Sequence, residues 1–584
     1  MPGPTEPIPS SEGPRPGTDG GTQRRRRTAW LILAAAIAIY TSTGPAFLNG
    51  DAIPARYLPF SLLREGDYDL DEFTFLYDEA AVRSYPSPEG WPYFLTRQGG
   101  HFMSRYSPAS GTLAVPFYAL PVLAGISPTS HRVWRLERFA AGSLIALSAV
   151  FVFLALCERT SRRHATILAV LYAFGTGSFS LTSQILWEQT STQFLLAAGL
   201  LCVLRAERDR RYLWWAGVAL AGATVTRMPD FLLTAPLCLY LLVRHRTGAL
   251  RVVAGGLVPI AAMAAYNLAA MGSLAGSDRA ASHFAAYVWA VPLLDGLYGL
   301  LFSPSRGLFF FCPFLLFALP GVVAAWRRGP TMLRYASLGM VAFVCLYAKY
   351  IYWDGGWGYG PRFLVDITAL LCLFLAEPLE WIWARTRWRR VFLAAGGLSV
   401  GIHALGAYTY DPAWEGRAQP FASTYRRVGR WRDNQVFHHW RRLYDKSPLP
   451  TSANAPLELA ARYEVDARPR VVRAGAAFEV PIEVTNTGRA LWLNRTEGYF
   501  GTVRLAWLWY QNGKPLEATK GREDMPLTVD TEESVRFAGR MAAPEAPGDY
   551  VLKMGMVSEL FAFFHDQAVP DVEIPVHVTP ATEP

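Results

Sequence analysis

Long apolar runs separated by short polar segments fill the chain from residue 28 to residue 408. A helix needs about 20 mainly apolar residues to cross the hydrocarbon core of a bilayer. The pattern therefore predicts a polytopic α-helical membrane protein of about eleven spans. The runs cover residues 28–48, 139–157, 165–185, 190–205, 212–226, 230–243, 251–270, 308–326, 332–349, 363–384 and 391–408.

One further apolar run, residues 110–125, decides the sidedness of the chain. It is short and contains Pro116 and Pro121. If it is a re-entrant or interfacial segment, the later basic clusters lie on the same side of the membrane as Arg24–Arg27. If it is a true span, all of these later clusters lie on the opposite side. Because cytoplasmic loops carry the excess of Lys and Arg, we predict a cytoplasmic N-terminus and no crossing at this run.

The pattern changes after Tyr408. Residues 409–456 are polar and basic and are interpreted as a connector. From residue 457 to residue 584, short alternating runs are separated by turn signals such as Asn512-Gly513. About seven strands in this length predict an immunoglobulin-like β-sandwich, on the extracytoplasmic side. Trp492, Trp507 and Trp509 could form a sugar platform, but a place in the core is more common for such residues.

Composition supports a membrane protein with a disordered cytoplasmic tail over residues 1–27. Charged residues make up 18% of the chain, against about 25% in soluble domains. The net charge is +9, and the Lys and Arg residues lie in short clusters between the predicted spans, as residues that determine membrane topology do. No nucleic-acid partner is therefore expected. The six cysteines lie in apolar stretches without metal-type spacing, which supports neither a disulfide framework nor a zinc site.

Candidate chemistry gathers on the predicted outer side, beginning with the first outer loop, residues 49–138. Asp51 follows the first span directly, and a carboxylate there could act as a general base. Arg105 and Tyr106 precede the 110–125 run, and Arg105 could hold a phosphate through two hydrogen bonds. Trp187 and Glu188 cap another outer hairpin, where an interfacial Trp beside a solvated acid is equally consistent.

The remaining outer loops supply arginines and a glycine-rich string. Arg227 could pair with Asp230, and Arg306 lies in a turn at the head of a helix, where an anion can bind. The string from Tyr352 to Phe363 contains four glycines, Asp354, Trp357 and Arg362. It suits a sugar-phosphate head group, although an aromatic belt with an anchoring Arg would look similar.

Several of these strings resemble bacterial GT-C glycosyltransferases, which use polyprenyl-phosphate sugars and are related to protein mannosyltransferases and aminoarabinose transferases. Asn49-Gly50-Asp51 and the following Tyr57–Leu63 and Gly66–Leu70 resemble the first outer loop of that family. Arg105–Pro108 resembles its juxtamembrane segment, and Trp353–Arg362 resembles a W-x-G-G-x-G-x-G-x-R string of uncharacterised members. The resemblance covers residues 28–408 and implies a GT-C-like membrane domain.

The resemblance implies an inverting transfer of a sugar from a polyprenyl-phosphate donor to an acceptor hydroxyl on the outer face. It assigns the general base to Asp51 and the lipid phosphate to Arg362, with Arg105, Arg227 and Arg306 as further candidates. Many members carry an acidic pair early in the loop, whereas Ala52 follows Asp51 here. Other possible bases therefore stay open, as does a divalent metal. These alternative carboxylates are Asp69, Asp71 and Glu72.

The implied location is the bacterial cytoplasmic membrane, with a glycan, lipid or protein as acceptor. A secondary transporter is one alternative, but the chain shows neither paired halves nor charged midplane sites. A glycan ligase of the same superfamily and a non-catalytic scaffold also remain open.

Overall fold

The structure is a computed structural model in which the chain forms two compact units. The first unit contains residues 1–411 and 428–440, and the second contains residues 412–427 and 441–584. The residues that it describes are 19–44, 49–84, 87–130, 132–276, 286–410, 414, 431, 434–444, 451–453, 455, 458–494 and 501–581. Much of the predicted connector 409–456 and most of the predicted tail 1–27 lie outside these ranges.

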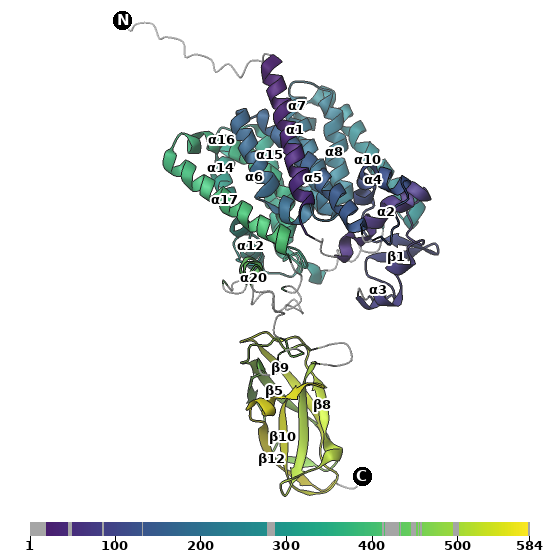
Figure 1. Cartoon of the computed structure of the whole chain (residues 1–584), viewed down its shortest axis with the longest axis vertical. Coiled ribbons are helices and arrows are strands. Elements are labelled where there is room, and N and C mark those ends of the chain that lie inside the picture. Colours follow the sequence, from purple (N-terminus) through teal and green to yellow (C-terminus); the bar gives the residue numbers. More distant parts are fainter. Residues whose placement is uncertain are drawn as a thin grey trace. The chain divides into compact units, whose positions relative to one another are not determined.

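Helices dominate the first unit, and every predicted apolar run contains helical residues (Figure 1). Four of the described helices are long and apolar enough to cross a membrane. They are α5 (Val133–Cys157), α10 (Ala249–Met271, preceded by one 3-10 turn), α15 (Thr331–Lys349) and α17 (Thr386–Thr409). The count of eleven spans therefore stays a prediction. The others with more than twelve residues are α1 (Asp19–Thr41), α4 (Ala109–Leu123), α6 (Arg162–Phe174), α7 (Glu188–Ala206), α8 (Tyr212–Thr226), α9 (Phe231–Arg244) and α16 (Thr368–Trp383).

The helix α1 begins earlier than the sequence pattern predicts. It starts at Asp19, inside the segment expected to be disordered, and the four residues Arg24–Arg27 belong to it. Arginine is a good helix former, and the hydroxyl of Thr28 donates to the carbonyl of Arg24 at 2.9 Å. The basic segment therefore extends the apolar helix by about two turns.

The segment predicted to be the first outer loop, residues 49–138, forms a structured cap. Its helices α2 (Ile53–Arg64) and α4 pack together, and Phe60 meets Tyr118 edge-on with 5.7 Å between the ring centroids. The short hairpin of β1 (Leu95–Gln98) and β2 (His101–Ser104) follows the helix α3 (Glu79–Ser84). A buried ion pair of 2.6 Å joins Arg56 of α2 to Glu137 of α5, so the cap is fixed to the bundle. The run 110–125 is the 15-residue helix α4, which is shorter than a usual span.

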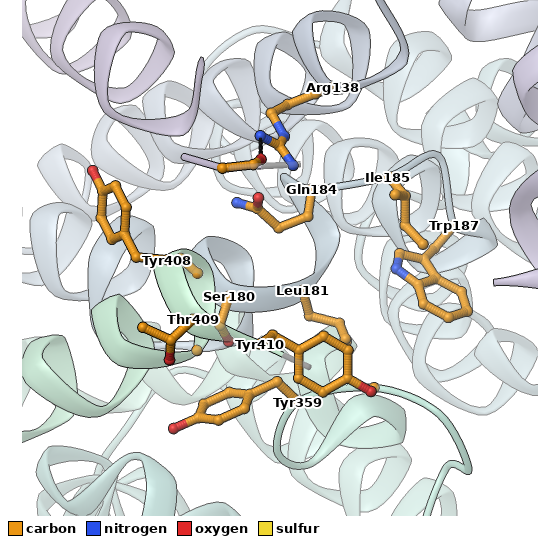
Figure 2. Close-up of a pocket in the computed structure, with 14 residues that line it drawn as sticks. Arg138, Ser180, Leu181, Gln184, Ile185, Trp187, Tyr359, Tyr408, Thr409 and Tyr410 are labelled. Carbon is orange, nitrogen blue, oxygen red and sulfur yellow. Dashed lines mark hydrogen bonds between the residues drawn. The ribbon is translucent and has the colours of Figure 1, made fainter. Parts of the chain in front are cut away.

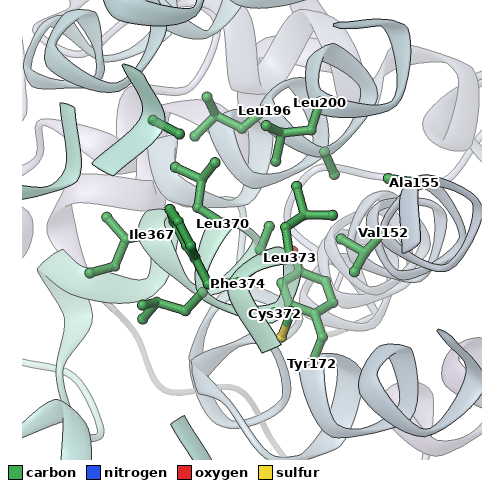
Figure 3. Close-up of a cluster of buried hydrophobic side chains, with 14 of the residues drawn as sticks. Val152, Ala155, Tyr172, Leu196, Leu200, Ile367, Leu370, Cys372, Leu373 and Phe374 are labelled. Carbon is green, nitrogen blue, oxygen red and sulfur yellow. The ribbon is translucent and has the colours of Figure 1, made fainter. Parts of the chain in front are cut away.

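Apolar side chains fill the centre of the bundle around α16. Leu370 and Phe374 of α16 belong to the same buried cluster as Leu196 and Leu200 of α7 and Val152 of α5 (Figure 3). The 3-10 segment η8 (Arg362–Ile367) leads directly into α16, so this core fixes the position of Arg362 at the helix head. By contrast, only 11% of the apolar stretch of α10 is buried, which is the surface that a lipid-facing helix presents.

The second unit is a β-domain with two sheets and one shared core. The larger sheet has the order β4 (Val471–Arg473), β12 (Val572–Thr579), β10 (Gly548–Ser558), β6 (Val503–Gln511) and β7 (Lys514–Pro515), with β8 (Gly521–Asp524) paired to β6 and β11 (Ala562–Phe563) to β10. The smaller sheet has the order β3 (Ala461–Val465), β5 (Ala477–Asn486) and β9 (Ser534–Ala542). A β-rich C-terminal domain is confirmed, and the immunoglobulin-like assignment stays a prediction.

The three tryptophans considered as a sugar platform lie in the core of this domain. Trp492 and Trp509 are fully buried, and Trp507 is 9% exposed. The indole nitrogen of Trp509 donates to the carbonyl of Ala542 at 3.1 Å, which joins the two sheets. The three rings therefore hold the sheets together and present no exposed platform.

Replacing Trp509 by Ala in a fragment of residues 441–584 is expected to lower its free energy of unfolding by about 3–5 kcal/mol, because a fully buried aromatic side chain leaves a cavity. Chemical denaturation followed by circular dichroism measures this change. Val471→Ala is the control, since that side chain is 62% exposed and its loss should change stability by less than about 0.5 kcal/mol. Equal effects of the two substitutions would contradict the assignment of Trp509 to the core.

Candidate active site

An aspartate and an arginine that are far apart in the sequence meet at one end of the helix bundle. The Oδ2 atom of Asp51 accepts a hydrogen bond of 2.6 Å from Nη2 of Arg362. Asp51 belongs to the 3-10 turn η1 (Gly50–Ala52) after α1, and Arg362 begins η8 before α16. Their side chains are 21% and 11% exposed, so the pair is only partly shielded from solvent.

Aromatic side chains surround this pair. The hydroxyl groups of Tyr93 and Tyr106 both donate to Oδ1 of Asp51, the former at 3.2 Å. The guanidinium carbon of Arg362 lies 3.7 Å from the ring centroid of Trp187, a close cation–π contact. The carboxylate and the guanidinium are thus each held by two further groups, because Arg362 also donates to the carbonyl of Gly355 at 3.2 Å.

The glycine-rich loop positions Arg362 through its unusual backbone. Gly355, Gly356 and Gly360 have positive φ values of 77°, 59° and 75°, a region that favours glycine. The guanidinium of Arg306 donates to the carbonyls of Gly356, at 2.7 Å, and of Gly358. One arginine side chain therefore satisfies several loop carbonyls at once and holds the loop in this shape.

A residue from near the end of the first unit closes the same loop. The amide of Gln435, in α20 (Gln435–Arg442), accepts from the backbone N–H of Gly360 at 2.8 Å and donates to the carbonyl of Gly358 at 2.9 Å. Asn49 adds a further link, because its amide donates to the carbonyl of Trp357 at 3.1 Å. The segment that carries Asp51 and the loop that carries Arg362 are thereby connected directly.

A second arginine and aspartate pair lies deeper in the bundle. The guanidinium of Arg227 bonds the carboxylate of Asp366, and it donates to the hydroxyl of Tyr347 at 2.5 Å. Asp230 lies 3.6 Å from the same guanidinium, and Thr192 donates to Asp366 at 3.0 Å. Because Asp366 belongs to η8, these contacts fasten the segment that begins with Arg362.

The other predicted residues are distributed around this centre. Arg105 pairs with Glu89 at 2.8 Å, and Glu188 accepts from the backbone N–H of Ser107 at 3.2 Å. Asp354 is 8% exposed; burial raises the pKa of its carboxyl, which the nearby Arg306 opposes. Trp357 is 40% exposed and contributes its backbone carbonyl.

The alternative carboxylates of the first outer loop have partners of their own. Asp71 bonds His101 at 2.7 Å, and Glu72 accepts from Ser61 at 2.5 Å. Ligand atoms of Asp69, Asp71 and His101 lie within 4.8 Å of one another, so these residues could hold a divalent metal ion. Among the hydrogen bonds of the described residues, Asp51 is the candidate base that contacts Arg362.

Sequence reasoning missed Tyr93, Asp366 and Gln435. Asp366 could have been found, because a carboxylate at the head of an apolar run needs a partner or a function. Tyr93 and Gln435 carry no comparable signal, since each lies in an ordinary polar segment of the chain.

No family model matches the chain, and no curated protein matches it. Solved structures to which it is similar include ArnT from Cupriavidus metallidurans bound to undecaprenyl phosphate, at 13% identity and a TM-score of 0.42 over 70% of this chain and 68% of that one. Another is the archaeal oligosaccharyltransferase AglB from Archaeoglobus fulgidus in complex with an inhibitory peptide and a dolichol-phosphate, at 12% identity and a TM-score of 0.39 over 73% of this chain and 64% of that one. Both are GT-C enzymes, the class named by the sequence resemblance.

The chain is also similar, over 23% of its length, to the CARDB domain of a Pyrococcus furiosus protein in complex with di-metal ions, at 16% identity, with 98% of that chain covered and a TM-score of 0.15. All of these TM-scores are below 0.5.

Arg306→Lys is expected to loosen the glycine-rich loop, because one ammonium group cannot reproduce the planar fork of a guanidinium. Each lost hydrogen bond to a charged group costs about 1.5–3 kcal/mol. Hydrogen exchange of the amides of residues 354–360 should therefore become faster. Arg334→Lys is the matched control, since Arg334 bonds a single carbonyl, that of Ala325, at 3.1 Å. Unchanged exchange in the loop would contradict the positioning role of Arg306.

Asp354→Asn is expected to change how stability depends on pH. Because the pKa of Asp354 is raised above its ordinary value of 3.8, the folded protein binds the proton more tightly than the unfolded chain. Its contribution to stability is therefore present at low pH and is lost as pH rises through the raised pKa. The variant should be as stable as the wild type at low pH. It should be more stable than the wild type at pH values above the raised pKa of Asp354. Melting midpoints measured across the acidic range test this, and parallel curves would contradict it.

Proposed function

We propose that this chain is a GT-C-type membrane glycosyltransferase that moves a sugar from a polyprenyl-phosphate donor to an acceptor hydroxyl. The observation that carries the proposal is the contact of 2.6 Å between Asp51 and Arg362. It brings a candidate base and a candidate phosphate ligand together, as the resemblance of the first outer loop and the glycine-rich string implies.

Arg362 is suited to a phosphate by its remaining hydrogen-bonding capacity. Its Nε atom is buried and has no hydrogen-bond partner among the described residues, and a buried unpaired donor is costly. A phosphate oxygen would satisfy this donor and could replace the Asp51 carboxylate at Nη2. The Trp187 ring would keep the guanidinium in place during the exchange.

Asp51 is suited to accept a proton once Arg362 has moved to the phosphate. The acceptor oxygen attacks the anomeric carbon of the sugar, and the bond from that carbon to the phosphate oxygen breaks. Polyprenyl phosphate leaves with the bonding electron pair, and the proton of the acceptor hydroxyl passes to the Asp51 carboxylate. Attack from the side opposite the leaving phosphate inverts the anomeric centre.

Tyr93 and Tyr106 orient the base during this step. Both phenols donate to the same oxygen, Oδ1, which leaves Oδ2 to face first Arg362 and then the acceptor. Asp354, Glu188 and the further arginines Arg105, Arg227 and Arg306 are proposed to support the site around this centre. The proposed location is the outer face of a bacterial cytoplasmic membrane, with the N-terminus inside.

Asp51→Asn is expected to lower sugar transfer by about 10²–10⁴-fold, because the amide cannot accept the proton. The assay is release of polyprenyl phosphate from a radiolabelled polyprenyl-phosphate hexose in proteoliposomes. Binding of polyprenyl phosphate should persist or strengthen, because Arg362 no longer has to break an ion pair with the Asp51 carboxylate before it binds the phosphate. Arg362→Lys should weaken that binding, because an ammonium group lacks the two-pronged geometry.

Glu72→Gln is the matched control for the base. It neutralises another carboxylate of the same loop, one that hydrogen bonds Ser61, and should leave transfer within a few-fold of wild type. Full transfer by Asp51→Asn together with a loss in Glu72→Gln would move the base to Glu72. Full transfer by both variants would refute an aspartate or glutamate base at these positions.

A further inference from the structure

A cavity of about 310 Å³ lies beside Trp187, at the outer ends of several helices. Neither Asp51 nor Arg362 lines it, so it is a separate space next to the reacting pair. Its walls come from the residues after α1, from α5, from the π-helical turn η3 (Ser178–Thr182), from the glycine-rich loop and from α17 (Figure 2). Its polar and aromatic lining includes the side chains of Arg138, Gln184, Trp187, Tyr359, Tyr408 and Tyr410.

Two buried donors of the lining have no acceptor among the described residues. They are Nε1 of Trp187, whose side chain is 1% exposed, and Nε of Arg138, which is 3% exposed. The nitrogen of Trp187 lies on the side of its ring that faces the other labelled residues in Figure 2. An unpaired buried donor costs about 1–3 kcal/mol, so the cavity favours a ligand that presents acceptor oxygens.

The other lining groups define the chemistry of that ligand. Tyr359, Tyr408 and Tyr410 supply aromatic surface, while Gln184 supplies an amide that can both donate and accept. Among the described residues that line the cavity there is no carboxylate, and Arg138 is their one cation. A bare phosphate would use the donors and leave the aromatic surface unused, whereas a sugar ring offers apolar C–H faces to the aromatics and hydroxyl oxygens to the donors.

Trp187 connects this cavity to the reacting pair. The Trp187 ring, whose centroid lies 3.7 Å from the guanidinium carbon of Arg362, also lines the cavity. Gly358 of the glycine-rich loop lines the cavity as well. A ring bound there would have one edge beside the groups that carry out the transfer. We propose that this cavity binds a sugar ring of the acceptor, so that the acceptor hydroxyl is a sugar hydroxyl. The inference rests on the proposed glycosyl transfer and names its acceptor class.

Binding of methyl glycosides to the full chain in lipid nanodiscs tests the proposal without any lipid-linked donor. The probes are the methyl glycosides of glucose, galactose, mannose and arabinose, followed by saturation-transfer NMR. At least one glycoside should bind saturably. Trp187→Phe should lower the affinity for that glycoside about tenfold, because the variant keeps an aromatic ring but lacks the N–H donor. A tenfold change corresponds to about 1.4 kcal/mol. Arg138→Lys, which keeps the charge and removes Nε–H, should weaken the same probe if Trp187→Phe fails to fold.

Trp383→Phe is the matched control. The indole nitrogen of Trp383 is also buried without a hydrogen-bond partner among the described residues, but this side chain does not line the cavity. Its variant should bind the glycoside as the wild type does. The proposal is overturned if no probe binds, if both tryptophan variants bind equally, or if inorganic phosphate displaces the glycoside from its site.

Asp51→Asn separates this proposal from the proposed function. Asp51 does not line the cavity, so the variant should lose transfer and keep glycoside binding. Retained transfer with glycoside binding that depends on Trp187 would refute the base and keep the sugar site. Lost transfer without any glycoside binding would keep the base and refute the sugar site.

Discussion

The ion pair between Asp51 and Arg362 is the constraint around which one end of the helix bundle is arranged. The two residues flank the first and a late apolar helix, and a charged group at the end of an apolar helix is costly without a partner. The glycine-rich loop bends through positive φ values so that Arg362 can reach back towards Asp51. Arg306 and Gln435 satisfy the carbonyls that this bend exposes. The loop, its braces and the head of α16 are therefore consequences of one contact.

Much of this arrangement could be predicted from the sequence. Apolar length predicts where helices occur, and glycines next to one arginine predict a tight loop with a cation at its end. The choice of Asp51, Arg362, Tyr106 and Trp187 as one group followed from their common predicted side of the membrane, and the structure brings all four into contact. Alternating apolar residues and turn signals predicted the β-domain. Trp507 and Trp509 are two residues apart and so share one face of a strand, which favoured a place in the core for Trp509, and Trp509 is buried.

The partners of the remaining arginines could be predicted only in part, because the sequence shows that a charge needs a partner but not which distant residue supplies it. Arg306 lies in a turn at a helix head, where an anion or a capping role would satisfy the same pattern, yet it bonds carbonyls some fifty residues later in the chain. Arg227 forms the ion pair with Asp230 that the sequence suggests, at 3.6 Å, but its hydrogen bond goes to Asp366, which no sequence pattern indicates. Packing of α7, α8 and η8 decides these pairings, and packing is a property of the whole bundle.

Burial distinguishes the two arginine and aspartate pairs chemically. Arg227 and Asp366 are 5% and 0% exposed, and breaking a buried pair by removing one partner costs about 3–5 kcal/mol. Arg362 and Asp51 are 11% and 21% exposed, so solvent compensates part of that cost when they separate. This difference supports the proposal that Arg362, rather than Arg227, exchanges its carboxylate for the phosphate of a lipid-linked donor. In that proposal, the buried pair holds η8 in place, so that the partly exposed pair opens while the head of α16 keeps its position.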